Sequence, residues 1–231
     1  MSMWNREKET LSRDEYAKLQ LEGLKKSLAR VWNNEFYRSR LAKGGVGSPE
    51  DVKSLDDLAK LPFFTKEDFR EAYPLKMSCV DRKELLEFHM SSGSTGTPVV
   101  MAYTKGDLLQ WAECMARCYA MAGLEKGDAF QIIPTFGLFN GGFGFYHGAR
   151  KAGLFTVPAS SGNTERQIRL MKENGLRGTF LLQYDALIRP EFTEIFLALD
   201  PAQFELGVWH EVVQPQVEDC GLTWRGRFSW D

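Results

Sequence analysis

The chain of 231 residues has almost no net charge and no long apolar run. Its formal net charge is -2, so no overall field would gather nucleic acid or an anionic membrane surface. No apolar stretch approaches the roughly 20 residues that a membrane-spanning helix needs. The first residues, Met1 to Glu7, are polar and contain no signal-peptide core. We therefore expect a cytoplasmic protein that binds neither nucleic acid nor membrane.

Cysteines are also few, and they lack the spacing of a metal cluster. The four of them (Cys79, Cys114, Cys118 and Cys220) form no CxxC pair. Cys114 and Cys118 lie four residues apart on a predicted helix, which would supply half of a metal site. We favour the alternative that they are two buried apolar thiols on one helix face. The sequence assigns no metal ligands.

What the chain does contain is ordinary for a soluble globular protein. Hydrophobic residues make up 43% and charged residues 26% of the sequence. The length suffices to bury a substantial core, either as one large domain or as two small ones. No internal repeat is present.

The first 80 residues indicate helices. Ser12 and Glu15 have the spacing of a capping box, and apolar residues follow at helical spacing as far as Val31. A shorter segment over residues 36–41 precedes the Gly44-Gly45 turn. Thr65 and Asp68 mark another helix start, which Pro74 limits.

From residue 85 the pattern alternates between strands and helices. Such alternation predicts βαβ units, so we expect residues 85–183 to form a mostly parallel sheet with helices on its faces. A glycine-aromatic turn over residues 137–148 leads into a short helix. Beyond residue 183 the alternation fades, although residues 190–199 could be helical. The predicted strands are 85–90, 99–103, 129–133, 154–157 and 179–182, and the predicted helices are 104–123 and 164–174.

The segment "HMSSGSTGTPVVMAYT", residues 89–104, joins the first two of these strands. A stretch rich in serine and glycine is often a flexible linker. This one is short and is flanked at once by apolar strands, and its glycines and hydroxyls suit the binding of an anion. It is not a Walker A loop, because no lysine follows Gly96 and a strand follows in place of a helix.

The loop resembles the phosphate-binding loop of adenylate-forming enzymes, and the chain resembles the phenylacetate–coenzyme A ligases over residues 3–178. This similarity rests on five segments in the same order: "MWNREKETLSRDEYAKLQLEGLKKSLARV", "SLDDLAKLPFFTKEDFREAYP", "SSGSTGTPVVMAYTKGDL", "GLFNGGFGFYHGARKAG" and "PASSGNTERQIRLMKENG". It implies an α/β fold, namely part of the N-terminal domain of an adenylate-forming enzyme, with a helical N-terminus before a largely parallel sheet.

The resemblance also implies the chemistry. A carboxylate attacks the α-phosphate of Mg²⁺–ATP to give an acyl-adenylate and pyrophosphate. The thiol of coenzyme A then attacks the acyl group, which gives a thioester and AMP. Backbone N–H groups and hydroxyls suit the task of holding the β- and γ-phosphates. The implied phosphate-binding residues are Ser92, Gly93, Ser94, Thr95 and Gly96.

The small-molecule partner implied is an aryl carboxylic acid. Aromatic side chains suit an aryl ring, although each of them is equally suited to ordinary core packing. We expect Phe136, Phe139 and His147 to share one cavity near the loop, where open α/β sheets place ligands. His89 is expected to be structural. The candidate substrate-binding residues are Phe136, Phe139, Phe143, Tyr146 and His147, and no catalytic residue is assigned.

Two segments depart from the family pattern. Thr97 stands where the family has a lysine, and Tyr146 to Arg150 read Tyr-His-Gly-Ala-Arg where the family has His-Tyr-Gly-Ala-Glu. The later motifs of the family for adenine, nucleotide and metal are absent. We therefore expect residues 1–183 to be the N-terminal part of a ligase domain and 184–231 to be a divergent tail.

A truncated or frame-shifted gene product, not active alone, would fit this pattern. The alternative is a non-catalytic module, derived from the ligase domain, that binds a small molecule or a protein. Whether the chain forms a homodimer is left open.

Overall fold

A computed structural model describes residues 3–91, 96–162, 164–174 and 178–180. These residues form two compact units. The hairpin unit consists of Asn5–Leu109 and Leu138–Asn140. The sheet unit contains Gln110–Gly137 and the described residues from Gly141 onward.

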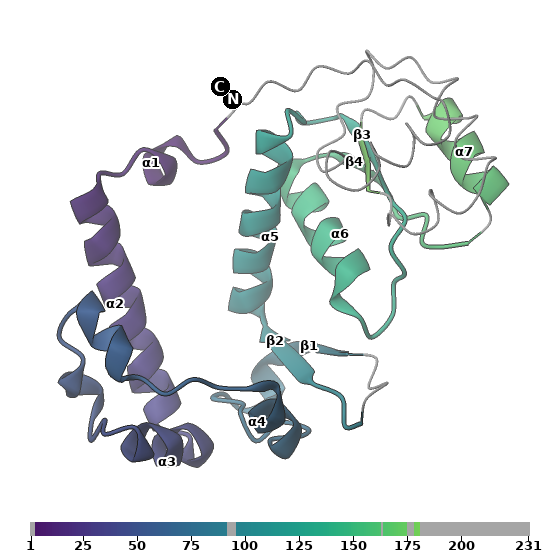
Figure 1. Cartoon of the computed structure of the whole chain (residues 1–231). Helices are drawn as coiled ribbons and strands as arrows, with labels where there is room; N and C mark the ends of the chain where they lie inside the picture. Colours follow the sequence, from purple (N-terminus) through teal and green to yellow (C-terminus); the bar gives the residue numbers. More distant parts are fainter. Residues whose placement is uncertain (1–2, 92–95, 163, 175–177, 181–231) are drawn as a thin grey trace, which may run out of the picture. The chain divides into compact units, whose positions relative to one another are not determined.

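The hairpin unit begins with helices and ends in a two-stranded sheet (Figure 1). Its elements are α1 (Arg6–Glu9), α2 (Arg13–Trp32), α3 (Glu35–Lys43), the 3₁₀ helices η1 (Pro49–Asp51) and η2 (Leu55–Lys60), α4 (Lys66–Glu71), the 3₁₀ helix η3 (Arg82–Glu84), β1 (Leu85–Met90) and β2 (Val100–Thr104).

The capping boxes predicted from the sequence are present. Ser12 and Glu15 cap α2 reciprocally, and Thr65 and Asp68 do the same for α4. The core of the helical part comes from α2, α3 and the turns that follow them. It contains the buried residues Leu28, Leu41, Val46 and Val52.

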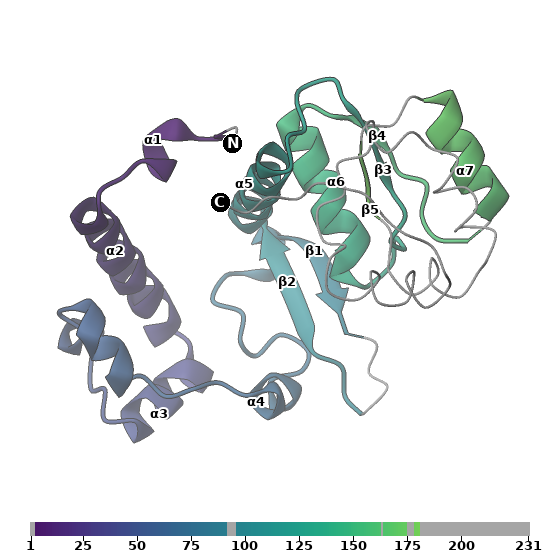
Figure 2. The same cartoon turned by 45° about the horizontal axis from the view of Figure 1, so that its top comes forward.

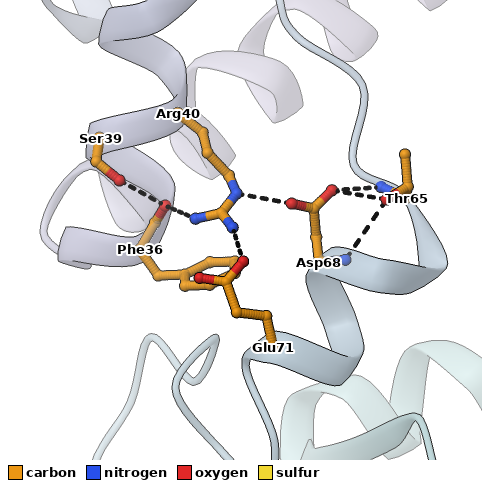
Figure 3. Close-up of polar contacts among 6 residues, drawn as sticks. All are labelled: Phe36, Ser39, Arg40, Thr65, Asp68 and Glu71. Carbon is orange, nitrogen blue, oxygen red and sulfur yellow. Dashed lines mark hydrogen bonds and ion pairs between the residues drawn. The ribbon is translucent and has the colours of Figure 1, made fainter.

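One arginine joins α3 to α4 (Figure 3). The Arg40 guanidinium donates from Nε to Asp68 at 2.8 Å and from Nη2 to Glu71 at 2.7 Å. It also lies 3.6 Å from the ring centroid of Phe36. The N–H of Thr65 and the side chain of Arg40 lower the pKa of Asp68, because both stabilise its charged form. The junction is therefore held by charge-assisted hydrogen bonds.

The segment 89–104 does connect two neighbouring strands, but the strands are antiparallel. β1 and β2 pair from Leu85 with Thr104 to Met90 with Val100, in a sheet of their own. The expectation that they belong to the parallel sheet was wrong. Parallel neighbours need a crossover of about a dozen or more residues, whereas a chain that turns back within residues 91–99 pairs antiparallel.

The sheet unit has the predicted parallel strands. The order is β4-β3-β5, and β3 pairs in parallel with both neighbours. Figures 1 and 2 both show α6 on one side of these strands and α7 on the other. The elements are α5 (Lys105–Met121), which begins in the hairpin unit, β3 (Ala129–Ile132), α6 (Asn140–Ala152), β4 (Phe155–Val157), α7 (Thr164–Glu173) and β5 (Gly178–Phe180).

Helix α5 exposes the two cysteines that were expected to be buried. Its buried stripe runs through Ala112, Ala116 and Tyr119. Cys114 and Cys118 follow members of this stripe by two residues, which turns them by about 200° around the helix toward solvent. Both are free thiols. In the part of the chain described, no group of three or more His, Cys, Asp or Glu side chains is placed to hold a metal ion.

Helix α6 covers more of the glycine-aromatic segment than the sequence predicted. It runs from Asn140 to Ala152, whereas only a short helix after a turn was expected. The buried glycines Gly144 and Gly148 explain the difference, because they face α5 and stabilise the helix through packing that local propensity does not reveal.

The expected helix over 190–199, the end of the last strand and the tail 184–231 lie outside the described residues. None of the helices in the described segments is both long enough and apolar enough to span a bilayer.

Candidate functional site

The hairpin closes the base of the predicted phosphate loop with two hydrogen bonds. The N–H of Ser91 donates to the carbonyl of Val99 at 2.9 Å, and the N–H of Val99 donates to the hydroxyl of Ser91 at 2.9 Å. The strands thereby fix both ends of the loop. Ser92, Gly93, Ser94 and Thr95 lie outside the described residues, so their role stays a prediction.

The last residues of the loop are described. Gly96 has a φ of +124°, which L side chains rarely adopt, and a Cβ built on it would meet nothing within 4 Å. Thr97, where the family has lysine, is exposed. A lysine substituted at position 97 would therefore be exposed to solvent next to Gly96.

The aromatic candidates are placed by the close approach of α6 to its neighbours. A Cβ on Gly142 would lie 2.9 Å from the Thr135 carbonyl, and one on Gly144 would lie 2.3 Å from the indole of Trp111. A Cβ on Gly148 would lie 2.2 Å from Cβ of Met115. Since real Cβ atoms do not approach this closely, glycine is required at all three positions for this packing.

Four of the five predicted acid-binding residues form one aromatic cluster. Phe143, Tyr146 and His147 share a face of α6 through their three- and four-residue spacing. Phe136, just after β3, meets Phe143 edge-on at 5.4 Å between centroids and Tyr146 at 6.0 Å. His147 lies 6.2 Å from Phe143 and 6.1 Å from Tyr146.

The structure adds Trp111 to this cluster. Its ring lies 6.0 Å from His147 in an edge arrangement. From the sequence, Trp111 was only part of an apolar helix. The signal that could have identified it is the glycine at position 144, because a glycine within a helix often permits a bulky neighbour to approach.

Part of the cluster also belongs to the core. Phe136 and Tyr146 pack against the buried residues around Tyr119 and Phe130. The hydroxyl of Tyr119 donates to the Phe145 carbonyl at 2.8 Å, and burial raises the Tyr119 pKa well above its usual value. The cluster is thus anchored in the core on one side, and its substrate role stays a prediction.

The fifth candidate, Phe139, is assigned to the other compact unit. Phe139 is 65% exposed and belongs to the hairpin unit, where the Leu138 carbonyl accepts a hydrogen bond from Met90. His89 is buried in β1, with Nε2 at 3.0 Å from Glu87 and its ring 5.6 Å from Tyr103. These contacts make His89 a packed strand residue.

A cavity of about 360 Å³ lies within the hairpin unit. Its lining includes Arg30, Tyr37, Cys79, Met101 and Tyr103, together with other residues of α4, β2 and the segment before β1. It shares no residue with the candidate site, and the sequence did not predict it.

Comparison with known proteins connects these features to one family. The phenylacetate-coenzyme A ligase of Pseudomonas putida is 42% identical over 166 residues, which are 71% of this chain and 38% of that protein. The one of Thermus thermophilus is 36% identical over 226 residues, which are 94% of this chain and 50% of that protein. The chain matches an N-terminal portion of the phenylacetate–coenzyme A ligase family. No protein-family model matches it.

Solved structures agree with the fold. A crystal structure of 2-hydroxyisobutyryl-CoA ligase, in complex with 2-HIB-AMP and CoA in the thioesterification state, has a TM-score of 0.74 and 25% identity. The matched region is 84% of this chain and 42% of that ligase chain. An open conformation of that ligase has a TM-score of 0.75 at 23% identity, covers 91% of this chain and is itself covered to 48%.

The chain therefore spans between 38% and 50% of the length of these ligases from P. putida and T. thermophilus. The alignment with the T. thermophilus ligase covers 94% of this chain. Since residues 184–231 are a larger share of the chain than the part left uncovered, the alignment extends beyond residue 183. The proposed boundary at residue 183 stays a prediction.

Proposed function

We propose that this chain provides the phosphate- and acid-binding part of an ATP-dependent ligase, which activates an aryl carboxylic acid as an acyl-adenylate and passes it to coenzyme A. The observation that carries the proposal is the loop of residues 91–99, rich in glycine and hydroxyls and closed at its base by β1 and β2. The similarity to phenylacetate-coenzyme A ligases supports it.

The residues present fit the phosphates of ATP. The sequence of the loop supplies small residues and hydroxyl donors, which suit an anion, and hydrogen bonds between Ser91 and Val99 hold its two ends together. When bound, Mg²⁺–ATP would supply the activated phosphorus and the pyrophosphate leaving group. The chain would hold the β- and γ-phosphates through Ser92 to Gly96.

The proposed acid site is the aromatic cluster of Phe136, Phe143, Tyr146 and His147, with Trp111 as its further member. Its edge-on ring contacts suit an aryl group that packs in the same manner. We infer that the acid is aryl-substituted and that it lies with its ring among these side chains.

The exposed Thr97 makes a direct test of phosphate binding. A lysine in its place would put a positive charge beside the loop. A hydrogen bond to a charged group contributes about 1.5–3 kcal/mol, and solvent screening makes the contribution of an exposed pair smaller. We expect Thr97→Lys to tighten binding of magnesium pyrophosphate about 3- to 10-fold. Thr97→Met is the matched control, since it has a long side chain without the charge.

The measurement is calorimetric titration of the purified chain with Mg²⁺–pyrophosphate and Mg²⁺–ATP. Ser94→Ala should weaken both titrations, whereas Ser27→Ala, on the exposed face of α2, should change neither. The proposal fails if the wild-type chain binds neither phosphate ligand, or if Ser94→Ala and Thr97→Lys both behave as wild type. Binding of an aryl acid without any phosphate binding would favour the non-catalytic module.

A further inference from the structure

Two glutamines form a buried polar pair between β3 and α7. Gln131 is 0% exposed and Gln167 is 2% exposed. Side chains alternate along a strand, so Phe130 and Ile132 face the apolar core while Gln131 faces α7. A buried amide is unfavourable unless it is hydrogen-bonded, which makes the partners of this pair informative.

The hydrogen bonds of the pair lead from the sheet to a loop. Nε2 of Gln131 donates to Oε1 of Gln167 and, at 3.4 Å, to the Gln167 carbonyl. Nε2 of Gln167 in turn donates to the carbonyls of Ser160 and, at 3.2 Å, Gly162. The two amides therefore connect the middle of β3 to the backbone of residues 159–162, which we call the β4–α7 loop.

Further contacts fix the β4–α7 loop. The N–H of Ser160 donates to the Ile132 carbonyl at 3.0 Å, and the hydroxyls of Thr135 and Ser161 lie 2.7 Å apart. Ser160 has a φ of +60°, the only positive φ of a non-glycine residue in the described part of the chain. Such strained backbone persists where the surroundings over-determine it, often at functional sites.

The loop lies where an open α/β sheet binds ligands. It follows β4, at the carboxyl ends of the parallel strands β3 and β4. Thr135 and Ser161 are exposed there, and Thr135 directly precedes Phe136 of the aromatic cluster. A pair of hydroxyl donors thus borders the rings that are proposed to hold the aryl group.

We propose that Gln167, supported by Gln131, is a positioning residue that holds the β4–α7 loop so that the hydroxyls of Thr135 and Ser161 bind the carboxylate of the aryl acid. This inference rests on the proposed function and deepens it by assigning the polar end of the acid site. Gln167 acts through the loop backbone, whereas the two hydroxyls contact the ligand.

The decisive variant is Gln167→Glu, read as a function of pH. Its carboxylate would still accept from Gln131, but it would turn negative charge toward the carbonyls of Ser160 and Gly162. Once protonated, it regains one O–H donor for the loop. Burial raises the pKa of such a carboxyl, so protonation falls within a practical pH range.

The readout is the Kd for phenylacetate, measured by equilibrium dialysis at pH 8 and pH 5.5. We expect Gln167→Glu to bind about 10-fold more weakly than wild type at pH 8 and within about 3-fold of it at pH 5.5. Gln167→Met should bind weakly at both pH values, because it has no donor. A structural role alone would not produce recovery at the lower pH.

Two surface variants keep the test independent of folding. Thr135→Val and Ser161→Ala remove one hydroxyl each from exposed positions, and each should weaken binding about 5-fold or more with an unchanged Tm. Wild-type affinity in both, or in Gln167→Met, would overturn the inference. So would a folded Gln167→Glu variant without recovery at pH 5.5.

Failure of the proposed function can be distinguished from failure of the positioning role of Gln167. If the wild-type chain binds no aryl acid, the acid site is wrong, and hydrogen exchange at Ser160 decides whether Gln167 positions the loop. Its amide is bonded to Ile132, so Gln167→Met should speed its exchange at least 10-fold relative to the amides of β3. Unchanged exchange would overturn the positioning role as well.

Discussion

Replacing Gly148 by alanine tests the packing that shapes the aromatic cluster. The new Cβ would lie 2.2 Å from Cβ of Met115, 3.1 Å from the Tyr119 ring and 3.2 Å from the backbone carbon of Met115. The first of these atoms cannot rotate away, because a Cβ is fixed by its own backbone. Helices α5 and α6 must therefore move apart.

The magnitude follows from two opposing effects. Overpacking a well-packed interior costs about 1–3 kcal/mol, and this contact belongs to the upper part of that range. Alanine in place of glycine within a helix returns about 1 kcal/mol. We expect Gly148→Ala to lower the free energy of unfolding by about 1–2 kcal/mol, which corresponds to a Tm lower by roughly 2–8 °C for a chain of this size.

Two matched substitutions separate these effects. Gly23 lies within α2 and Gly137 in the sheet unit before α6, and a Cβ on either would meet nothing within 4 Å. Gly23→Ala should raise stability by about 0.5–1 kcal/mol, and Gly137→Ala, at a residue whose φ is not positive, should not lower it. The assay is urea denaturation followed by circular dichroism. A Gly148→Ala variant as stable as Gly23→Ala would refute the close approach of α5 and α6.

Two other predictions concern charge and thiol exposure. The pKa of Asp68 is lowered from 3.8, so its stabilising effect is present above that pH and is lost as the pH falls through the lower, folded-state pKa. Asp68→Asn should therefore reduce the urea midpoint at pH 7 and much less at pH 2.5, whereas the exposed Asp56→Asn should change neither. Pulsed iodoacetamide labelling mapped by mass spectrometry should modify the exposed Cys114 and Cys118 at least 10-fold faster than Cys79, whose pKa is raised by burial. Equal rates at all three would contradict the exposure of α5.

Local signals predicted most of the secondary structure. The pairs Ser12–Glu15 and Thr65–Asp68 act as capping boxes, because reciprocal capping depends only on residues three apart. The Thr104–Asp107 pair likewise forms reciprocal hydrogen bonds at the start of α5. The antiparallel direction of β1 and β2 could also have been predicted from the sequence, since residues 91–99 are too few for a parallel crossover.

The missed features depend on contacts between distant parts of the chain. Nothing near Gln131 in the sequence indicates a partner 36 residues later, and an apolar strand gives no reason to expect a buried amide that donates to it. Cys114 is exposed because the face of α5 that contains Ala112 and Ala116 is buried. The sequence does not identify this face, since apolar residues occur on more than one face of the helix. Trp111 joined the candidate site only because Gly144 lets its ring approach α6.

Binding of phenylacetate to the purified chain tests the central claim most directly. Equilibrium dialysis with labelled phenylacetate, with and without Mg²⁺–ATP, would be compared with hexanoate as an acid that lacks a ring. The account predicts saturable binding of phenylacetate at least 10-fold tighter than that of hexanoate, and a loss of this preference in His147→Ala, because the ring is held by aromatic contacts. Equal affinities for the two acids, or no saturable binding of phenylacetate, would contradict it.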